Sequence, residues 1–118
     1  MPKILVVDDA AFMRMRASKL LSEEGYEIVE AGNGVEALKI YQEEKPDGVL
    51  MDITMPEMDG LTALKEIRKL DPAARIAMVT AMGQQAIILE ALKAGARDFV
   101  IKPFEKERVV DAVAKLLA

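Results

Sequence analysis

Short apolar runs without polar alternation recur along this chain, and segments of helical periodicity separate them. Four such runs are residues 4–7, 48–51, 76–79 and 99–101, and residues 26–31 form a further strand-like segment. Unbroken apolar runs of this length are typical of parallel strands that are covered on both faces. The pattern therefore predicts five strands that alternate with helices.

Five amphipathic segments follow these strands. Their inward positions are predicted to be Ala10, Met13, Ala17, Leu20 and Leu21 in the first, Gly34, Leu38 and Tyr41 in the second, Ala63, Leu64 and Ile67 in the third, Ile88 and Leu92 in the fourth, and Val109, Val113, Leu116 and Leu117 in the fifth. Gly25 and Gly95 are expected to end two of the helices, Pro46 to limit another, and Asp59 to cap the third. Short connections between alternating elements predict an α/β fold: one doubly wound five-stranded parallel sheet with five helices in a single domain over residues 1–118.

The predicted fourth helix, roughly residues 84–94, has an apolar excess. Residues 86–89 are all apolar, and four residues at about 100° each cover most of the helix circumference. If Ile88 and Leu92 face the core, Ile87 or Leu89 is partly exposed. Such a residue is either an isolated surface hydrophobe or part of a docking surface for another protein.

Composition excludes several classes of function. The 118 residues include 16 Lys and Arg against 20 Asp and Glu, so the mildly acidic chain is a poor candidate for nucleic-acid binding. It has no cysteine, which removes disulfides and thiol chemistry, and no histidine, which removes the usual general base at neutral pH. We see no signal peptide or membrane-spanning stretch, and expect a cytoplasmic protein without a membrane partner.

Residues that bind phosphate or metal follow four of the five predicted strands. Asp8 and Asp9 come after the first, Asp52 after the third, Thr80 after the fourth and Lys102 after the fifth. Because the carboxyl ends of parallel strands open into one crevice, these side chains are expected to converge there. Any single aspartate could be only a turn or helix cap, but the whole set at strand ends predicts a site.

Clustered carboxylates raise one another's pKa unless a positive charge lies among them. Mg²⁺ suits such a cluster, because it prefers oxygen ligands and binds one or two carboxylates together with phosphate oxygens. We expect Asp9 and Asp52 as direct ligands, Asp8 acting mainly through water, and the backbone carbonyl of Thr54 as a further ligand.

Covalent phosphoryl transfer explains the residue set better than two other uses of an acidic site. A two-carboxylate hydrolase must keep one acid protonated, and sugar-binding aromatics are not evident. An NTPase needs a phosphate-binding loop, yet the G-x-x-x-x-G-K-[ST] motif is absent. A carboxylate nucleophile, Asp52, with Mg²⁺, Lys102 and Thr80 would instead accept a phosphoryl group already activated on another molecule.

Two other interpretations are weaker. Residues 32–37 fit the dinucleotide motif G-x-G-x-x-A, but they follow the second strand, and the chain is too short for two mononucleotide-binding halves. A tight turn into a helix is favoured there. Phosphatases that form an aspartyl phosphate commonly carry a second aspartate two residues after the nucleophile, and this chain has Thr54 instead.

Four motifs together resemble the receiver domain of the two-component response regulators from end to end. They are Val7-Asp8-Asp9, residues 51–60 (MDITMPEMDG), Thr80-Ala81 and Lys102-Pro103-Phe104. Residues 9–15, 81–85 and 93–96 further resemble the stand-alone chemotaxis regulators of this family. The resemblance implies a flavodoxin-like sheet with strand order 2-1-3-4-5.

The resemblance also implies roles for the site residues. Asp52 would accept the phosphoryl group from a histidine kinase, and Lys102 would pair with Asp52 and the phosphoryl oxygens. Asp8, Asp9, Asp52 and the Thr54 carbonyl would organise Mg²⁺. The protein would promote only its own phosphorylation and dephosphorylation, and would not be a turnover enzyme.

A conformational switch is implied at the adjoining strand ends. Thr80 would move to bind the phosphoryl group and Phe99 would rotate inward, a steric response because Phe99 lacks the hydroxyl of the tyrosine that many relatives carry. The Lys102-Pro103 bond is often cis in this family, whereas X-Pro bonds in folded proteins are cis only about 5–6% of the time. A phosphoryl group adds about −1.5 to −2 charge, which can shift the packing of the fourth helix and fifth strand.

The implied partners are a histidine kinase, a downstream target such as a flagellar motor switch protein, and a phosphatase as a further candidate. The output surface would consist of the fourth helix, fifth strand and fifth helix of a monomer. The alternative is an isolated receiver domain from a DNA-binding transcriptional regulator.

Overall fold

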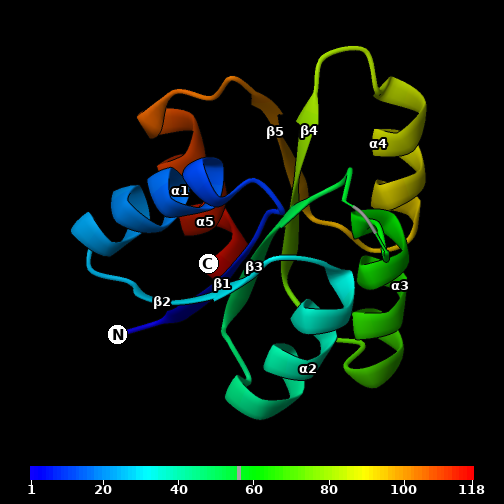
Figure 1. Cartoon of the computed structure of the whole chain (residues 1–118), viewed down its shortest axis with the longest axis horizontal. Coiled ribbons are helices and arrows are strands. Elements are labelled where there is room, and N and C mark those ends of the chain that lie inside the picture. Colours follow the sequence, from blue (N-terminus) through cyan, green and yellow to red (C-terminus); the bar gives the residue numbers. More distant parts are fainter. Residues whose placement is uncertain (56) are drawn as a thin grey trace.

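A computed structural model describes residues 1–55 and 57–118, so Pro56 of the motif at residues 51–60 lies outside the described residues. The strands are β1 (Lys3–Val7), β2 (Glu27–Ala31), β3 (Gly48–Asp52), β4 (Ile76–Ala81) and β5 (Asp98–Lys102). The helices are α1 (Ala11–Glu23), α2 (Gly34–Glu44), α3 (Gly60–Leu70), α4 (Gln85–Lys93) and α5 (Lys106–Leu117). All strand pairs are parallel in the order β2-β1-β3-β4-β5, which confirms the predicted fold (Figure 1).

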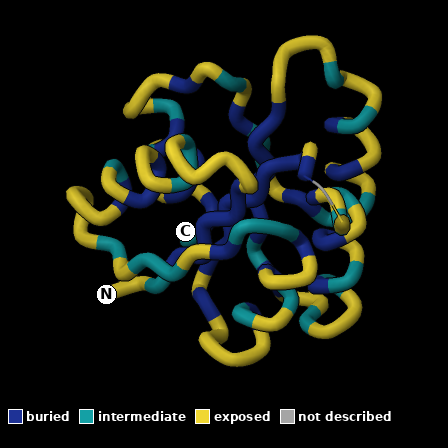
Figure 2. The backbone as a smooth tube through the Cα atoms, in the orientation of Figure 1, coloured by how far each residue is buried: buried dark blue, intermediate teal, exposed yellow. Residues whose placement is uncertain are grey.

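Helices cover both faces of the sheet. Figure 1 shows α1 and α5 on one side and α2, α3 and α4 on the other. Apolar residues that alternate along the strands contribute to two cores: in β1, Leu5 and Val7 pack with α2 and α3, whereas Ile4 and Val6 pack with α1 and α5. The burial of both faces explains why the central strands are continuously apolar (Figure 2).

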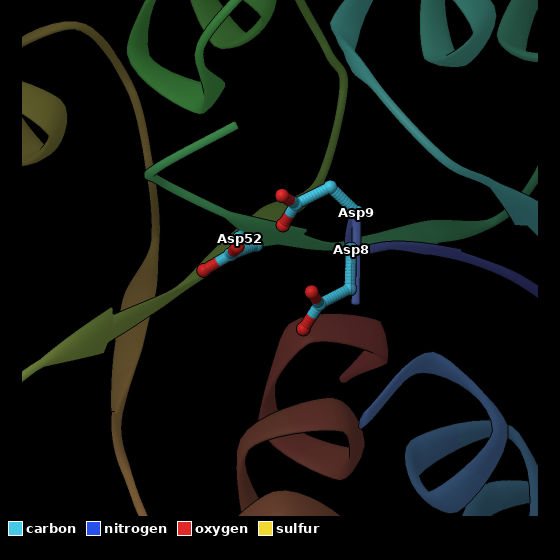
Figure 3. A group of neighbouring side chains, drawn as sticks. All are labelled: Asp8, Asp9 and Asp52. Carbon is cyan, nitrogen blue, oxygen red and sulfur yellow. The ribbon is translucent and has the colours of Figure 1, made fainter. Parts of the chain in front are cut away.

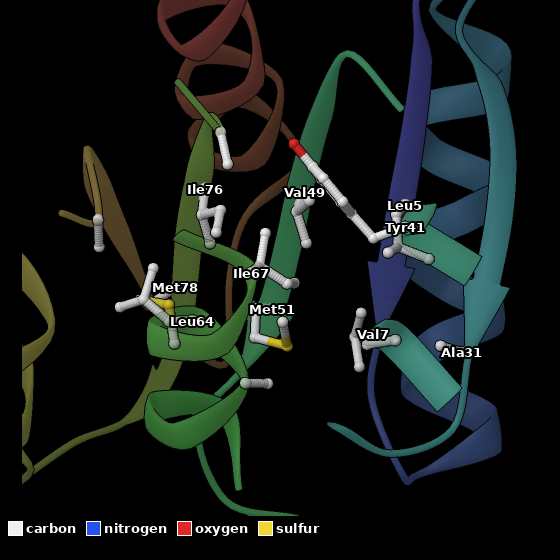
Figure 4. Packing of buried hydrophobic residues seen from close by; sticks show 14 of the residues in the cluster. Leu5, Val7, Ala31, Tyr41, Val49, Met51, Leu64, Ile67, Ile76 and Met78 are labelled. Atoms are coloured by element: carbon white, nitrogen blue, oxygen red, sulfur yellow. The ribbon is translucent and has the colours of Figure 1, made fainter. Parts of the chain in front are cut away.

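The core beneath α2, α3 and α4 contains large side chains from three strands. Figure 4 shows Leu5 and Val7 of β1, Met51 of β3 and Met78 of β4, which belong to one cluster with Leu64 of α3. All five are almost completely buried. This packing fixes the strands rigidly and therefore fixes the positions of the residues at their carboxyl ends.

Most predicted helix ends are confirmed. Gly25 and Gly95 have φ values of +94° and +112° just after α1 and α4, which is the left-handed conformation that glycine favours. Asp59 caps α3, because its Oδ1 accepts a hydrogen bond from the Thr62 amide at 2.8 Å. Within the described ranges, none of the helices is both long and apolar enough to span a bilayer.

Two inward assignments were wrong. Ala10 precedes α1 as its N-cap and is exposed. Leu92 is 38% exposed, and Ala91 occupies the core position beside Ile88 instead. Since Ile87 also packs against the core, the buried direction of α4 lies between residues 87, 88 and 91, which turns Leu92 outward. The expected partial exposure on this helix is confirmed at Leu89, which is 59% exposed.

Candidate functional site

The sheet brings three carboxylates together at its carboxyl edge. Val7 pairs with Met51, so Asp8 directly after β1 lies beside Asp52, the last residue of β3. Asp8 and Asp52 are buried and Asp9 is exposed. Carboxylate oxygens of the three residues lie within 4.8 Å of one another, and Figure 3 shows the side chains gathered at one point. The predicted convergence of the three aspartates is confirmed.

Lys102 completes this cluster from β5. Its Nζ lies 3.0 Å from Asp8 Oδ2 and 3.3 Å from Asp52 Oδ1. Burial lowers the pKa of the Lys102 ammonium, but the two carboxylates outweigh burial and the net pKa is raised. Lys102 is therefore a cation that balances part of the acidic cluster.

Asp52 has the most perturbed carboxyl group of the site. Burial and then the negative charge of Asp8 raise the pKa of Asp52 from 3.8 to about 6, while Lys102 partly opposes the shift. Asp52 is thus ionised near neutral pH, but its charge is poorly solvated. A carboxylate in this state gains from a further cation and can act as a nucleophile.

The donor set fits Mg²⁺. Three carboxylates supply hard oxygen ligands at one point, and one ammonium group does not neutralise them all. Thr54 follows two residues after Asp52 and is exposed. Its carbonyl as a ligand stays a prediction, as do the direct binding through Asp9 and the water-mediated role of Asp8.

Close backbone packing at Gly60 positions the loop that follows Asp52. The Gly60 amide donates to the Ile53 carbonyl at 2.7 Å. A Cβ atom at residue 60 would collide with the backbone carbonyl of Asp52. We had not predicted this role, although a glycine directly after the helix cap Asp59 was a possible signal.

Thr80 follows Val79, the β4 residue that pairs with Asp52, and its hydroxyl is hydrogen-bonded to Gln84. Its side chain is completely buried, and its Oγ1 donates to Gln84 Oε1 at 2.5 Å. Gln84 also accepts from the Ala81 amide at 3.0 Å and donates to Thr54 Oγ1 at 3.3 Å. Sequence reasoning assigned no role to Gln84, although it lies in the segment at residues 81–85 that resembles the chemotaxis regulators and is a polar residue at the start of the fourth helix.

The remaining predicted switch residues lie on β5 and just after it. Phe99 is half-buried against the core beneath α4 and lines a cavity of about 400 Å³. The Lys102-Pro103 peptide bond is cis, as the resemblance implied and contrary to the general frequency of X-Pro bonds.

Residues 32–34 form the predicted turn into α2, with the Asn33 side chain capping the helix.

The fold and the acidic edge define the class of flavodoxin-like α/β domains whose strand ends form a carboxylate pocket. The chain belongs to the response regulator receiver domains, because the model of that family matches residues 4–114. It is 56% identical to the chemotaxis protein CheY of Bacillus subtilis over 116 residues, which cover 98% of this chain and 97% of that protein.

Two further relatives agree with this assignment. The CheY of Thermotoga maritima is 56% identical over 115 residues, covering 97% of this chain and 96% of that protein. A chain in the crystal structure of the CheX–CheY–BeF₃–Mg²⁺ complex from Borrelia burgdorferi superposes with a TM-score of 0.93 at 34% identity, covering 98% of this chain and 89% of that chain. The protein is a phosphorelay response regulator homologous to the chemotaxis regulators.

Proposed function

We propose that this receiver accepts a phosphoryl group on Asp52 from a histidine kinase and signals to a protein target in chemotaxis. The observation that carries the proposal is the buried Asp52 carboxylate at the end of β3, flanked by Asp8, Asp9 and Lys102. The CheY relatives support chemotaxis as the pathway. As the target we propose a flagellar motor switch protein.

The residues of the site have complementary tasks in this reaction. An Asp52 carboxylate oxygen forms a bond to phosphorus, while the bond from phosphorus to the kinase imidazole breaks and its electron pair stays with the imidazole. The Lys102 ammonium lies where it can pair with the added negative charge. Asp8, Asp9, Asp52 and the Thr54 carbonyl would hold Mg²⁺, which neutralises phosphoryl oxygens when bound. The protein would act only on its own phosphoryl group.

An apolar cavity supports the α4 and β5 part of the proposed output surface on α4, β5 and α5. The cavity has a volume of about 400 Å³ and is lined by residues of α4, β5, the end of β4 and the loop before α4. Leu89, Leu92 and Ile101 on its walls are exposed. Because these exposed side chains line one cavity, we favour docking of a protein target over isolated surface hydrophobes.

Other partners follow from the relatives. The Borrelia CheY chain is bound to CheX, which supports binding of a second protein besides the target; we propose a phosphatase as one such partner. The alternative origin, a receiver domain of a DNA-binding regulator, is not favoured, because the chain is 56% identical to two CheY proteins.

Labelling with radioactive acetyl phosphate in the presence of Mg²⁺ tests the acceptor. The wild-type protein should incorporate label, and Asp52→Asn should incorporate none because the amide is not a nucleophile. Asp111→Asn, which changes an exposed carboxylate on α5, is the matched control and should label like wild type. Persistent labelling of Asp52→Asn would refute the proposal.

A further inference from the structure

One side chain, that of Gln84, holds two hydrogen-bond donors at the end of β4. Its Oε1 accepts from Thr80 Oγ1 at 2.5 Å and from the Ala81 backbone amide at 3.0 Å. Its Nε2 donates to Thr54 Oγ1 at 3.3 Å. A single amide group therefore links the end of β4 to the loop that follows Asp52.

The hydroxyl proton of Thr80 is committed to Gln84 in this arrangement. Thr80 Oγ1 has two acceptors within reach, the Gln84 oxygen at 2.5 Å and the Ala81 carbonyl at 3.2 Å. A hydroxyl donates one proton, and the shorter contact takes it. Thr80 cannot donate to a phosphoryl oxygen on Asp52 while this bond persists. The Gln84 oxygen thus competes with a phosphoryl oxygen for the same donor.

Gln84 also reaches the proposed output surface. It immediately precedes α4 and lines the apolar cavity together with Leu89 and Phe99. Release of its amide group from Thr80 and Ala81 would free the beginning of α4 from the end of β4. Gln84 is therefore hydrogen-bonded to the Thr80 hydroxyl and also lines the cavity of the proposed output surface.

We propose that Gln84 is a positioning residue that holds Thr80 and Ala81 in the unphosphorylated arrangement by presenting its amide oxygen in place of a phosphoryl oxygen. This inference rests on the proposed function, with Asp52 as the acceptor. The covalent change is confined to Asp52, and the step at Gln84 is an exchange of hydrogen bonds. When Asp52 carries a phosphoryl group, Thr80 and Ala81 exchange the Gln84 oxygen for phosphoryl oxygens, and Gln84 leaves Thr54. Gln84 thereby opposes activation of the receiver.

Binding of beryllofluoride with Mg²⁺, measured by calorimetry, tests this inference. Gln84→Met keeps a side chain of similar length but removes the competing acceptor, so it should bind beryllofluoride about three- to tenfold more tightly than wild type. Gln85→Ala truncates the neighbouring exposed glutamine and should bind like wild type. In a Thr80→Val background the gain from Gln84→Met should shrink, because one of the two released donors is missing.

The outcomes separate the two proposals. If wild-type protein fails to bind beryllofluoride, the proposed function itself is wrong. If wild type binds and folded Gln84→Met binds equally or more weakly, only the role of Gln84 is refuted.

An NMR measurement on wild-type protein needs no substitution. Beryllofluoride should move the Gln84 side-chain amide resonances toward those of a free glutamine and should shift the Ala81 amide. Unchanged Gln84 resonances in the beryllofluoride complex would overturn the inference even if the variants failed to fold.

Discussion

The ionisation of Asp52 makes the stability of the metal-free protein depend on pH. Its pKa is about 6 in the folded protein against 3.8 ordinarily, so between these values the folded state binds a proton that the unfolded state has lost. The free energy of unfolding therefore falls as pH rises through this window. Asp52→Asn lacks the group and should gain about 1–2 kcal/mol relative to wild type between about pH 4 and pH 7, after allowance for solvent screening.

Urea unfolding in EDTA measures this difference. Asp111→Asn removes an exposed carboxylate and should follow the pH profile of wild type. If the stability of Asp52→Asn and wild type changed in parallel over the whole range, the raised pKa of Asp52 would be wrong.

The charged residues of the cluster could be predicted as a set, because their shared position at the ends of predicted parallel strands places them together, although any single aspartate could be only a cap. Asp8, Asp52 and Lys102 directly follow or end apolar runs, and parallel strands place such positions at one edge. Gln84 carried no comparable signal. Its role depends on the path of the loop after β4 and on a side-chain rotamer, and neither leaves a periodic pattern in the sequence.

At the scale of the elements, the junction of β3 and α3 depends on a glycine. Gly60→Ala should strongly destabilise the protein, by about 3 kcal/mol or more, since the added Cβ meets the backbone of Asp52 and Ile53. Gly48→Ala is the matched comparison, because its Cβ would meet the flexible ends of Leu116 and Ile4 at 3.1 and 3.3 Å. Thermal unfolding should show the smaller loss at Gly48; equal losses would contradict the assigned role of Gly60.

The two kinds of apolar residue on α4 should respond differently to substitution. Ile88→Ala truncates a buried side chain and should cost about 2–4 kcal/mol of unfolding free energy. Leu89→Ala should change stability by about 0.5 kcal/mol or less, because the side chain is mainly exposed. Leu89→Ala should instead weaken binding of the target to the beryllofluoride complex, measured by calorimetry. Unaltered target binding would remove Leu89 from the output surface.

The elements themselves were predictable where several signals agreed. Strands β1 and β3 combine apolar runs with flanking polar residues, and α3 has a cap and a clear apolar face. The orientation of α4 could not be predicted, because its consecutive apolar residues allow more than one face of the helix to be buried. Packing of Ile87 and Ala91 on the core decided it, and that contact depends on where the sheet lies.

At the scale of the whole molecule, the site exists only in the folded state. Asp8, Asp52 and Lys102 are distant in the chain and meet because β1, β3 and β5 belong to one parallel sheet. Assembly of the like charges opposes folding, whereas a cation that binds the assembled cluster favours it. Ion binding and global stability must therefore be linked.

The linkage gives a quantitative prediction for Mg²⁺. A ligand that binds only the folded state at ten times its Kd adds about 1.4 kcal/mol to the free energy of unfolding, which raises Tm by about 5 °C for a domain of this size. The Kd from calorimetry should reproduce the measured change in Tm.

Asp52→Asn should lose most of the stabilisation by Mg²⁺, because a neutral amide replaces one of three clustered carboxylates. Asp111→Asn should retain it, and sodium chloride at equal ionic strength should not mimic it. If Mg²⁺ produced neither heat nor a shift in Tm, the carboxylates would not form a metal site, and their shared position would have to be explained by Lys102 alone.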